Sequence, residues 1–206
     1  DRVQIGDIQA CGGTAGGSNC PTEDRAVVTG FTGSTNFPLL GAFDTTNQVN
    51  EAFVTKLNGA GTGLAFSTFI GGNGADAGLG IALTGFNNSI CIGAVNFSDF
   101  IWITGFTRSS GNFPLQEAFD PLLGGGQDAF ATLIACNSTL RFSSYLGGLS
   151  DDRGNAIVAD PDGNAYLTGQ TSSPDLPGPN NGPPNGFQDD NEGGGSDSFM
   201  VKIGVP

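Results

Sequence analysis

The chain has 206 residues, of which 37% are hydrophobic and only 13% are charged. Its formal net charge is −13, with seven basic and 20 acidic residues, and it contains no histidine. This composition supports a packed core and argues against nucleic acid or an anionic membrane as partner, since both require Lys/Arg patches. Without histidine, Ser-His-Asp and Cys-His catalysis and imidazole metal sites are excluded.

Three tandem units account for the chain. Similar segments begin at Asp1, Asp76 and Asp152, and in each unit a Thr-Gly pair follows, starting at Thr29, Thr104 and Thr168. Such self-similarity at a fixed interval is the signature of repeat architectures. We therefore predict three units of one domain, 1–75, 76–151 and 152–206.

The first unit predicts four short strands. The first lies near residues 3–9, the second contains "TGFT", and the third and fourth are "AFVTKL" (52–57) and "LAFSTFI" (64–70), separated by the turn "NGAGTG". Alternation predicts one face with Phe53, Thr55 and Leu57, and another with Leu64, Phe66, Thr68 and Ile70. No window shows a helical apolar stripe.

The second and third units repeat this order. The second contains "FIWITGF", which reads as a buried strand, then "DAF" at 128–130 and "LRFSSYLGG" from Leu140. In the third, "NAIVAD" (155–160) and "NAYLTG" (164–169) flank "PDG", which is typical of a hairpin turn. The third unit ends with "DSFMVKIG" and has no counterpart of the final strand.

The recurring Phe residues are predicted to fill the core between units rather than to stack on ligands. They are Phe31, Phe37, Phe43, Phe106, Phe113 and Phe119.

The four cysteines predict two disulfides. Cys11 and Cys20 lie in one Gly-rich loop, and Cys91 and Cys136 both belong to the second unit, so we predict the pairs Cys11–Cys20 and Cys91–Cys136. Free thiols or zinc are the alternatives, and zinc is disfavoured because there is no CxxC pair.

The even number of cysteines favours an oxidising, extracytoplasmic setting. Sequons at Asn87, Asn96 and Asn137 are candidate glycosylation sites.

Four segments together carry a family resemblance. "TGFTGSTNFP", "EAFVTKL", "LAFSTFIGG" and "DPDGNAYLTG" resemble the bacterial beta-propeller repeat called SBBP. The resemblance implies a blade and a secreted or cell-surface setting, and it implies no defined chemistry. The fold class expected is all-β: three tandem four-stranded antiparallel units of propeller-blade type, the last lacking its final strand. The long connector from Ser172 to Asp197 departs from the family pattern.

An end-to-end assembly is expected from this architecture. Three blades do not close a ring, and the end strands are edges that can template strand addition. We predict that subunits join into a filament or ring, in which the strand near residues 3–9 or an inserted loop of one subunit meets the edge near 199–203 of the next. The alternative is an excised or mature piece of a larger closed propeller. The predicted assembly edge consists of Val3, Ile5, Ile8, Phe199, Val201 and Ile203.

No catalytic, cofactor or metal residues are assigned. Asp160 to Asn164 ("DPDGN") faintly resembles a calcium loop, but a hairpin turn explains it, and the acidic loop with Asp189, Asp190, Glu192 and Asp197 is expected to be solvated. Calcium remains only a weak candidate. Adjacent acids such as Asp151-Asp152 lack the separation and apolar pocket of glycosidases, so we expect no enzyme.

Two function classes remain. The first is an extracellular structural or adhesive repeat protein without nucleic-acid or membrane-inserted partners. The second is a carbohydrate- or cation-binding surface module that uses Trp102 or Tyr166, for which the single Trp and two Tyr are few.

Overall fold

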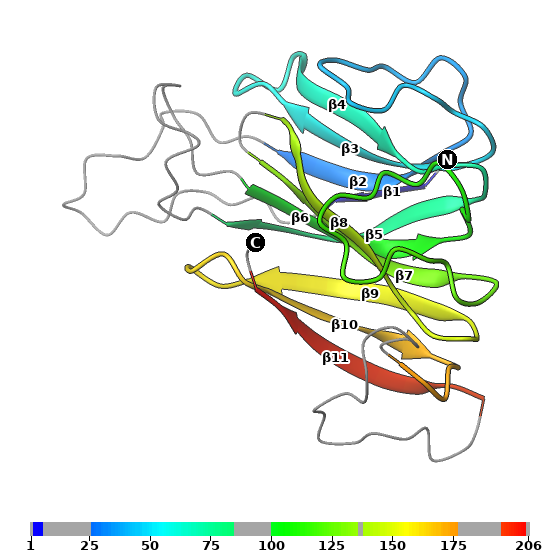
Figure 1. Ribbon diagram of the computed structural model, residues 1–206. Helices are drawn as coiled ribbons and strands as arrows, with labels where there is room; N and C mark the ends of the chain where they lie inside the picture. Colours follow the sequence, from blue (N-terminus) through cyan, green and yellow to red (C-terminus); the bar gives the residue numbers. More distant parts are fainter. Residues whose placement is uncertain (1, 6–25, 85–99, 136–137, 177–194, 205–206) are drawn as a thin grey trace.

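The computed structural model describes residues 2–5, 26–84, 100–135, 138–176 and 195–204. Within these ranges all regular structure is β-strand, arranged as three antiparallel sheets. The sheets lie on top of one another in chain order, with the first sheet at the top of Figure 1 and the third at the bottom. The expectation of an all-β protein made of antiparallel sheets is confirmed.

The first sheet contains β1 (Arg2–Ile5), β2 (Val27–Thr32), β3 (Glu51–Leu57) and β4 (Leu64–Ile70), in that order. The second contains β5 (Asp76–Thr84), β6 (Phe100–Thr107), β7 (Asp128–Ile134) and β8 (Leu140–Leu146). The third contains β9 (Asp152–Ala159), β10 (Ala165–Thr171) and β11 (Asp197–Ile203). Within each sheet, every strand pairs with the next strand along the chain, as expected for consecutive hairpins.

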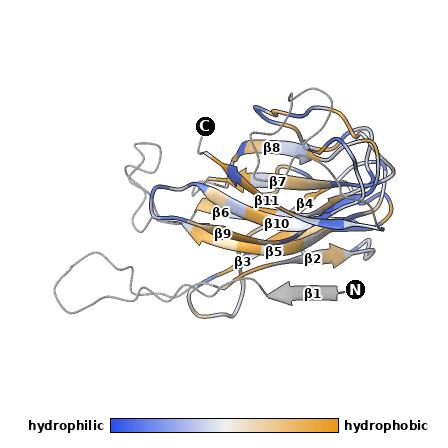
Figure 2. Ribbon diagram, turned by 90° about the horizontal axis from the view of Figure 1, so that it is seen from below, coloured by the Kyte–Doolittle hydropathy of each residue, from blue (hydrophilic) through white to orange (hydrophobic). Residues whose placement is uncertain are grey.

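The strands form where β-branched and aromatic residues run between Gly-rich or Asp/Asn-rich turns. β6 is an example, because its sequence FIWITGFT combines three aromatic and four β-branched residues. Figure 2 shows that hydrophobic residues follow the strands, whereas hydrophilic residues gather in several of the connecting turns. The turn between β9 and β10 uses Gly163 at a φ of 92°, a conformation that favours glycine.

Equivalent residues of the three units occupy equivalent register positions. Thr29 pairs with Val54, Thr104 with Ala131 and Thr168 with Met200 in the ladder between the second and third strands of each sheet. We call the face that bears these residues the leading face, because in the first two sheets it is directed toward the next sheet. The opposite face is the trailing face.

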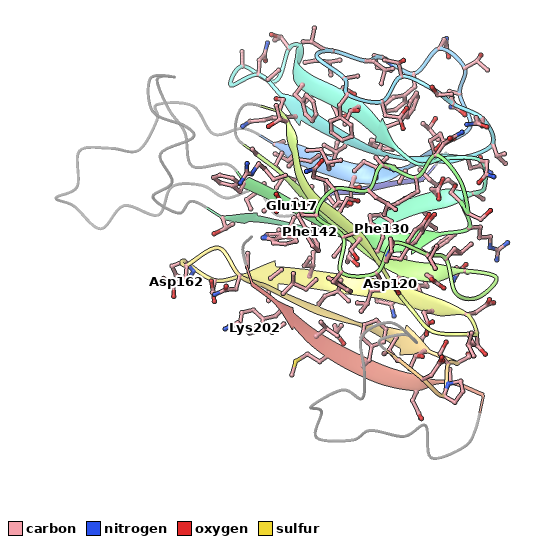
Figure 3. All side chains as sticks on the ribbon, in the orientation of Figure 1. Glu117, Asp120, Phe130, Phe142, Asp162 and Lys202 are labelled. Carbon is pink, nitrogen blue, oxygen red and sulfur yellow. The ribbon has the colours of Figure 1, made fainter. Side chains whose placement is uncertain are left out.

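Two hydrophobic clusters form the core between the sheets. The first joins the leading face of the first sheet, including Val54 and Phe66, to the trailing face of the second, including Ile103 and Phe130. The other joins Trp102 and Leu133 to Leu167 of the third sheet. Figure 3 shows Phe130 and Phe142 within this stack.

The predicted Phe core is confirmed in its best-buried members. Phe113 is 6% exposed and stacks on Tyr145 with ring centroids 5.1 Å apart. Phe43 and Phe119 are partly buried against the two clusters. Phe37 contacts Phe53 and Phe69 on the trailing face of the first sheet, at centroid distances of 4.6 and 5.7 Å. The part of the connector that carries Phe37 therefore folds over the trailing face of its own sheet, whereas Phe43 packs near Phe66 of the leading face.

Candidate functional site

The contact between sheets repeats a threonine–glycine approach. The Thr29 hydroxyl donates to Phe53 O at 2.8 Å, and the Thr104 hydroxyl donates to Phe130 O at 2.7 Å. A β-carbon on Gly78 would overlap the Thr29 hydroxyl, and one on Gly154 would overlap that of Thr104. Glycine is therefore required where the first strand of one sheet crosses the threonine of the sheet before it.

The third sheet presents the same threonine without a covering sheet among the described residues. The Thr168 hydroxyl donates to Phe199 O at 2.9 Å, as in the two preceding units, yet Thr168 is exposed whereas Thr29 and Thr104 are fully buried. Its neighbours on the leading face include Val158, 63% exposed, and Met200, 79% exposed. This leading face is the largest departure from the pattern of the first two sheets.

Polar residues hold one corner of the boundary between the first and second sheets. Glu51, the first residue of β3, and Asp76, the first residue of β5, are 0% and 1% exposed. Asp76 Oδ2 accepts hydrogen bonds from Gly72 N at 3.0 Å and from the Ser109 hydroxyl at 2.8 Å. A β-carbon on Gly71 would overlap Glu51 Oε2 and would lie 2.6 Å from Asp76 Oδ2. The Gly-Gly pair after β4 thus leaves room for two carboxyl groups.

The boundary between the second and third sheets has a similar corner. Asp152 Oδ2 accepts from Gly148 N at 2.8 Å and from the Ser173 hydroxyl at 2.7 Å. A β-carbon on Gly147 would overlap Asp128. Asp128 is one methylene shorter than Glu51, and it accepts from the backbone N–H groups of the adjacent loop, Gly124 at 2.8 Å and Gly125 at 3.2 Å. The two corners have the same arrangement of residues. They differ in the acid at the start of the third strand of the sheet, which is Glu51 in one corner and Asp128 in the other.

Burial raises the pKa of the acids at both corners. Desolvation is the main cause for Glu51, whose pKa rises to about 7, and the negative charges of Asp76 and Asp44 raise it further. For Asp128, desolvation together with the charges of Asp152 and Asp120 raises the pKa to about 6. Desolvation also raises the pKa of Asp76 and of Asp152, against the hydrogen bonds that each of them accepts.

Most of the site residues expected from sequence lie outside the described residues. These are Cys11, Cys20, Cys91, Cys136, Asn87, Asn96, Asn137 and Ile8, so the disulfide and glycosylation predictions stay predictions. The same holds for the acidic loop residues Asp189, Asp190 and Glu192. Val3 and Ile5 belong to β1, where they lie opposite Gly30 and Val28 of β2.

The other half of the predicted edge lies in β11. Phe199 and Ile203 are 9% and 7% exposed and belong to the core between the second and third sheets, and Val201 packs against it. Their side chains are thus directed into the protein, and the edge that β11 presents is its backbone. Among the described residues β11 pairs only with β10.

The aromatic candidates for a sugar site have structural contacts. Trp102 is 0% exposed, and its indole N–H donates to Gly163 O at 2.9 Å. The Tyr166 hydroxyl donates to Asp160 Oδ2 at 3.1 Å, and the Lys202 ammonium lies 5.3 Å from the centre of its ring. Trp102 is therefore inaccessible to a ligand from solvent.

The "DPDGN" segment forms the predicted hairpin turn. Asn164 donates to Asp160 from its backbone and from its side chain, each at 2.8 Å, and these bonds lower the pKa of the Asp160 carboxyl. Within the described ranges no three His, Cys, Asp or Glu side chains gather closely enough to hold a metal ion. No helix among the described residues is long and apolar enough to cross a membrane.

The two acidic corners were not recognised in the sequence as a site. The signals were present, since an acid opens each unit at Asp76 and Asp152 and another precedes the Phe of the third strand at Glu51 and Asp128. The "GG" that follows the fourth strand was the third signal. The sequence alone does not show that these three segments meet where two sheets touch.

Comparison with known families identifies one repeat. The family model described as beta-propeller repeat, SBBP, matches residues 141–177. That segment runs from β8 through β9 and β10, so it spans the boundary between the second and third sheets. The resemblance predicted from the sequence is confirmed for this segment, and the chain contains a β-propeller repeat module. No curated protein matches the chain.

Proposed function

We propose that this chain is a non-catalytic structural or adhesive module of an extracellular or cell-surface protein. Its three sheets act as consecutive propeller-type blades, and it associates end to end with further copies. The blade assignment is supported by the repeat match across β8 to β10 and by the equivalent register of the three sheets. The extracellular setting is supported by the even number of cysteines and by the family resemblance.

One observation carries the proposal of association. The leading face of the third sheet bears Val158 and Met200, which are among the most exposed large hydrophobic residues of the described chain. The equivalent positions in the second sheet, Ala82 and Ala131, are 7% and 0% exposed beneath the third sheet. The face that a following sheet buries in the first two units is therefore exposed in the third, with large apolar side chains on it that a further sheet would cover.

A second copy of the chain is the proposed occupant of this face, and the fit is imperfect. Val3 lies opposite Gly30 in the register, whereas Gly78 and Gly154 lie opposite Gly105 and Gly169. Valine has a β-carbon, so the first sheet of another copy cannot approach Thr168 as closely as Gly154 approaches Thr104. We therefore propose a weak association that depends on concentration.

Sedimentation velocity at increasing concentration tests this proposal. The full chain should show a rising sedimentation coefficient, and Met200→Lys should reduce the association by about tenfold or more, because it places a charge in the contact. Leu122→Lys is the matched control, since Leu122 is 62% exposed but lies in a connector. Val3→Gly should strengthen the association. Wild-type protein that remains monomeric at high concentration would refute the proposed function.

A further inference from the structure

The Glu51–Asp76 corner contains a buried oxygen without a donor. Glu51 Oε1 accepts a hydrogen bond from Gln48 N at 3.0 Å. Among the described residues no donor contacts Glu51 Oε2, although the side chain is fully buried. This oxygen and Asp76 Oδ2 border the same small space above Gly71. A buried carboxylate oxygen is costly unless a proton or a donor satisfies it.

Among the described residues, the charges around Glu51 do not supply a donor for this oxygen. The charges that act most strongly on Glu51 are those of Asp76 and Asp44, and both are negative. Across the same corner Tyr145 donates to Ser109 O at 2.6 Å. Burial, together with nearby acids including Asp76, raises its pKa to about 12, so it remains neutral. Apart from Glu51 itself, the groups that donate to Asp76 are Gly72, Thr107 and Ser109, and all three are neutral. Two adjacent carboxylates in such a setting do not both remain ionised.

We propose that Glu51 and Asp76 share one proton, and that this carboxyl–carboxylate hydrogen bond joins the first sheet to the second. The proton resides on Glu51 Oε2 and is donated to Asp76. When the pH rises, hydroxide removes the proton and the hydrogen bond is lost. Two mutually repelling carboxylates then remain at the sheet boundary.

The pH dependence follows from the sign of the shift. The pKa of Glu51 in the folded protein is raised from 4.5 to about 7. The contribution of the pair to stability is therefore fully present below about pH 4.5 and is lost as the pH rises through about 7. The Asp128 carboxyl, with its pKa near 6, titrates earlier, so the decline between about pH 6.5 and 8 belongs mainly to Glu51.

The second corner provides a comparison within the same molecule. Asp128 uses its two oxygens to accept from Gly124 N and Gly125 N, and its shorter side chain makes no hydrogen bond to Asp152. The effect of Asp152 on Asp128 is that of its charge alone. The acid pair therefore depends on the extra methylene of Glu51, and Glu51→Asp should separate the two carboxyl groups while preserving the charge.

The first test is a carboxyl ¹³C NMR titration of the full-length wild-type protein. The Glu51 carboxyl should titrate near pH 7, and in Asp76→Asn its midpoint should move to lower pH by about one unit, because the neighbouring charge is removed. The titration of the wild-type protein does not depend on whether any variant folds. A wild-type Glu51 that titrates at an ordinary value of about 4.3 would overturn the proposal.

The second test follows urea denaturation between pH 5 and 8.5. The midpoint of the wild-type protein should fall as the pH rises, and in Glu51→Gln the part of this decline between about pH 6.5 and 8 should disappear. Glutamine can still accept from Gln48 N and can donate to Asp76 without a titrating proton. Asp162→Asn is the matched control, because Asp162 is an exposed acid in the β9–β10 turn, as Figure 3 shows.

Two results of the second test would contradict a shared proton. One is a Glu51→Gln protein that retains the wild-type decline above pH 6.5. The other is a wild-type midpoint at pH 7.5 that rises with calcium chloride and does not rise in Glu51→Gln. That second result would mean that a cation, and not a proton, occupies the space between the carboxyl groups.

Discussion

Strands β7 and β11 occupy the same position in their sheets, yet they differ in burial. All seven residues of β7, Asp128–Ile134, are buried, whereas β11, Asp197–Ile203, buries only Phe199 and Ile203. On the trailing face the two strands share one feature, since Phe130 and Phe199 both pack against the preceding sheet. The difference lies on the leading face, where β7 is covered by the third sheet and β11 is not covered by any described residue.

The residues on the leading faces of β7 and β11 suit the different exposure of the two faces to solvent. β7 places Ala129, Ala131 and Leu133 there, and β11 places Ser198, Met200 and Lys202. The first set suits a dry contact between sheets, and the second combines one large apolar residue with a polar and a charged one. The mixed set is typical of surfaces that associate reversibly, because each partner must also remain stable in water.

The largest expected difference between these faces concerns core truncation. Leu133→Ala should lower the free energy of unfolding by about 3 kcal/mol, because Leu133 is 1% exposed between Trp102 and the third sheet. Lys202→Ala, at the equivalent position of β11, should change it by less than about 0.5 kcal/mol. Urea denaturation of both variants measures the difference. Equal costs would mean that the leading face of the third sheet is covered in solution.

The next largest expected effect on stability concerns the close approach of Gly71 to Glu51 at the boundary between the first two sheets. Gly71→Ala should destabilise the protein by about 2 kcal/mol, since the new β-carbon overlaps the buried Glu51 carboxyl. Gly195→Ala is the control, because nothing lies within 4 Å of a β-carbon at that position. In a Glu51→Ala background the cost of Gly71→Ala should be smaller, as a double-mutant cycle would reveal. An additive result would show that the two residues do not compete for space.

The smallest expected difference concerns the repeated threonine. Thr104→Val should cost about 1 kcal/mol by removing the buried hydrogen bond to Phe130 O, which is 2.7 Å long. Thr168→Val removes the same bond from an exposed site and should cost less than half as much. Thermal denaturation in parallel measures both changes. A larger cost for Thr168→Val would contradict the assignment of Thr168 to an uncovered face.

Much of the fold could be predicted from the sequence because the repeats carry local signals. The strands predicted at 52–57 and 64–70 form as β3 and β4, and the hairpin around "PDG" forms between β9 and β10. The third sheet has three strands among the described residues. Period-two alternation and turn residues act over a few positions, so a single sequence displays them.

The acidic corners could not be predicted in the same way. Glu51 and Asp76 were visible only as recurring acids at the starts of segments, and an acid at a strand end is usually exposed. Their burial depends on three segments, the start of β3, the Gly-Gly pair and the start of β5, that meet only when two sheets stack. The direction of Phe199 and Ile203 into the core likewise depended on knowing which face of β11 meets the second sheet.

The association face can be observed most directly through Met200, which is the only methionine of the chain and is 79% exposed on the leading face of the third sheet. Labelling with ¹³C-methyl methionine therefore gives one NMR signal that reports on this face alone. If copies join through the third sheet, the signal should shift or broaden as the protein concentration rises, and Val3→Gly should move this change to lower concentration. A Met200 signal that is unchanged by concentration while the protein sediments as an oligomer would show that the copies meet elsewhere, and would contradict the account.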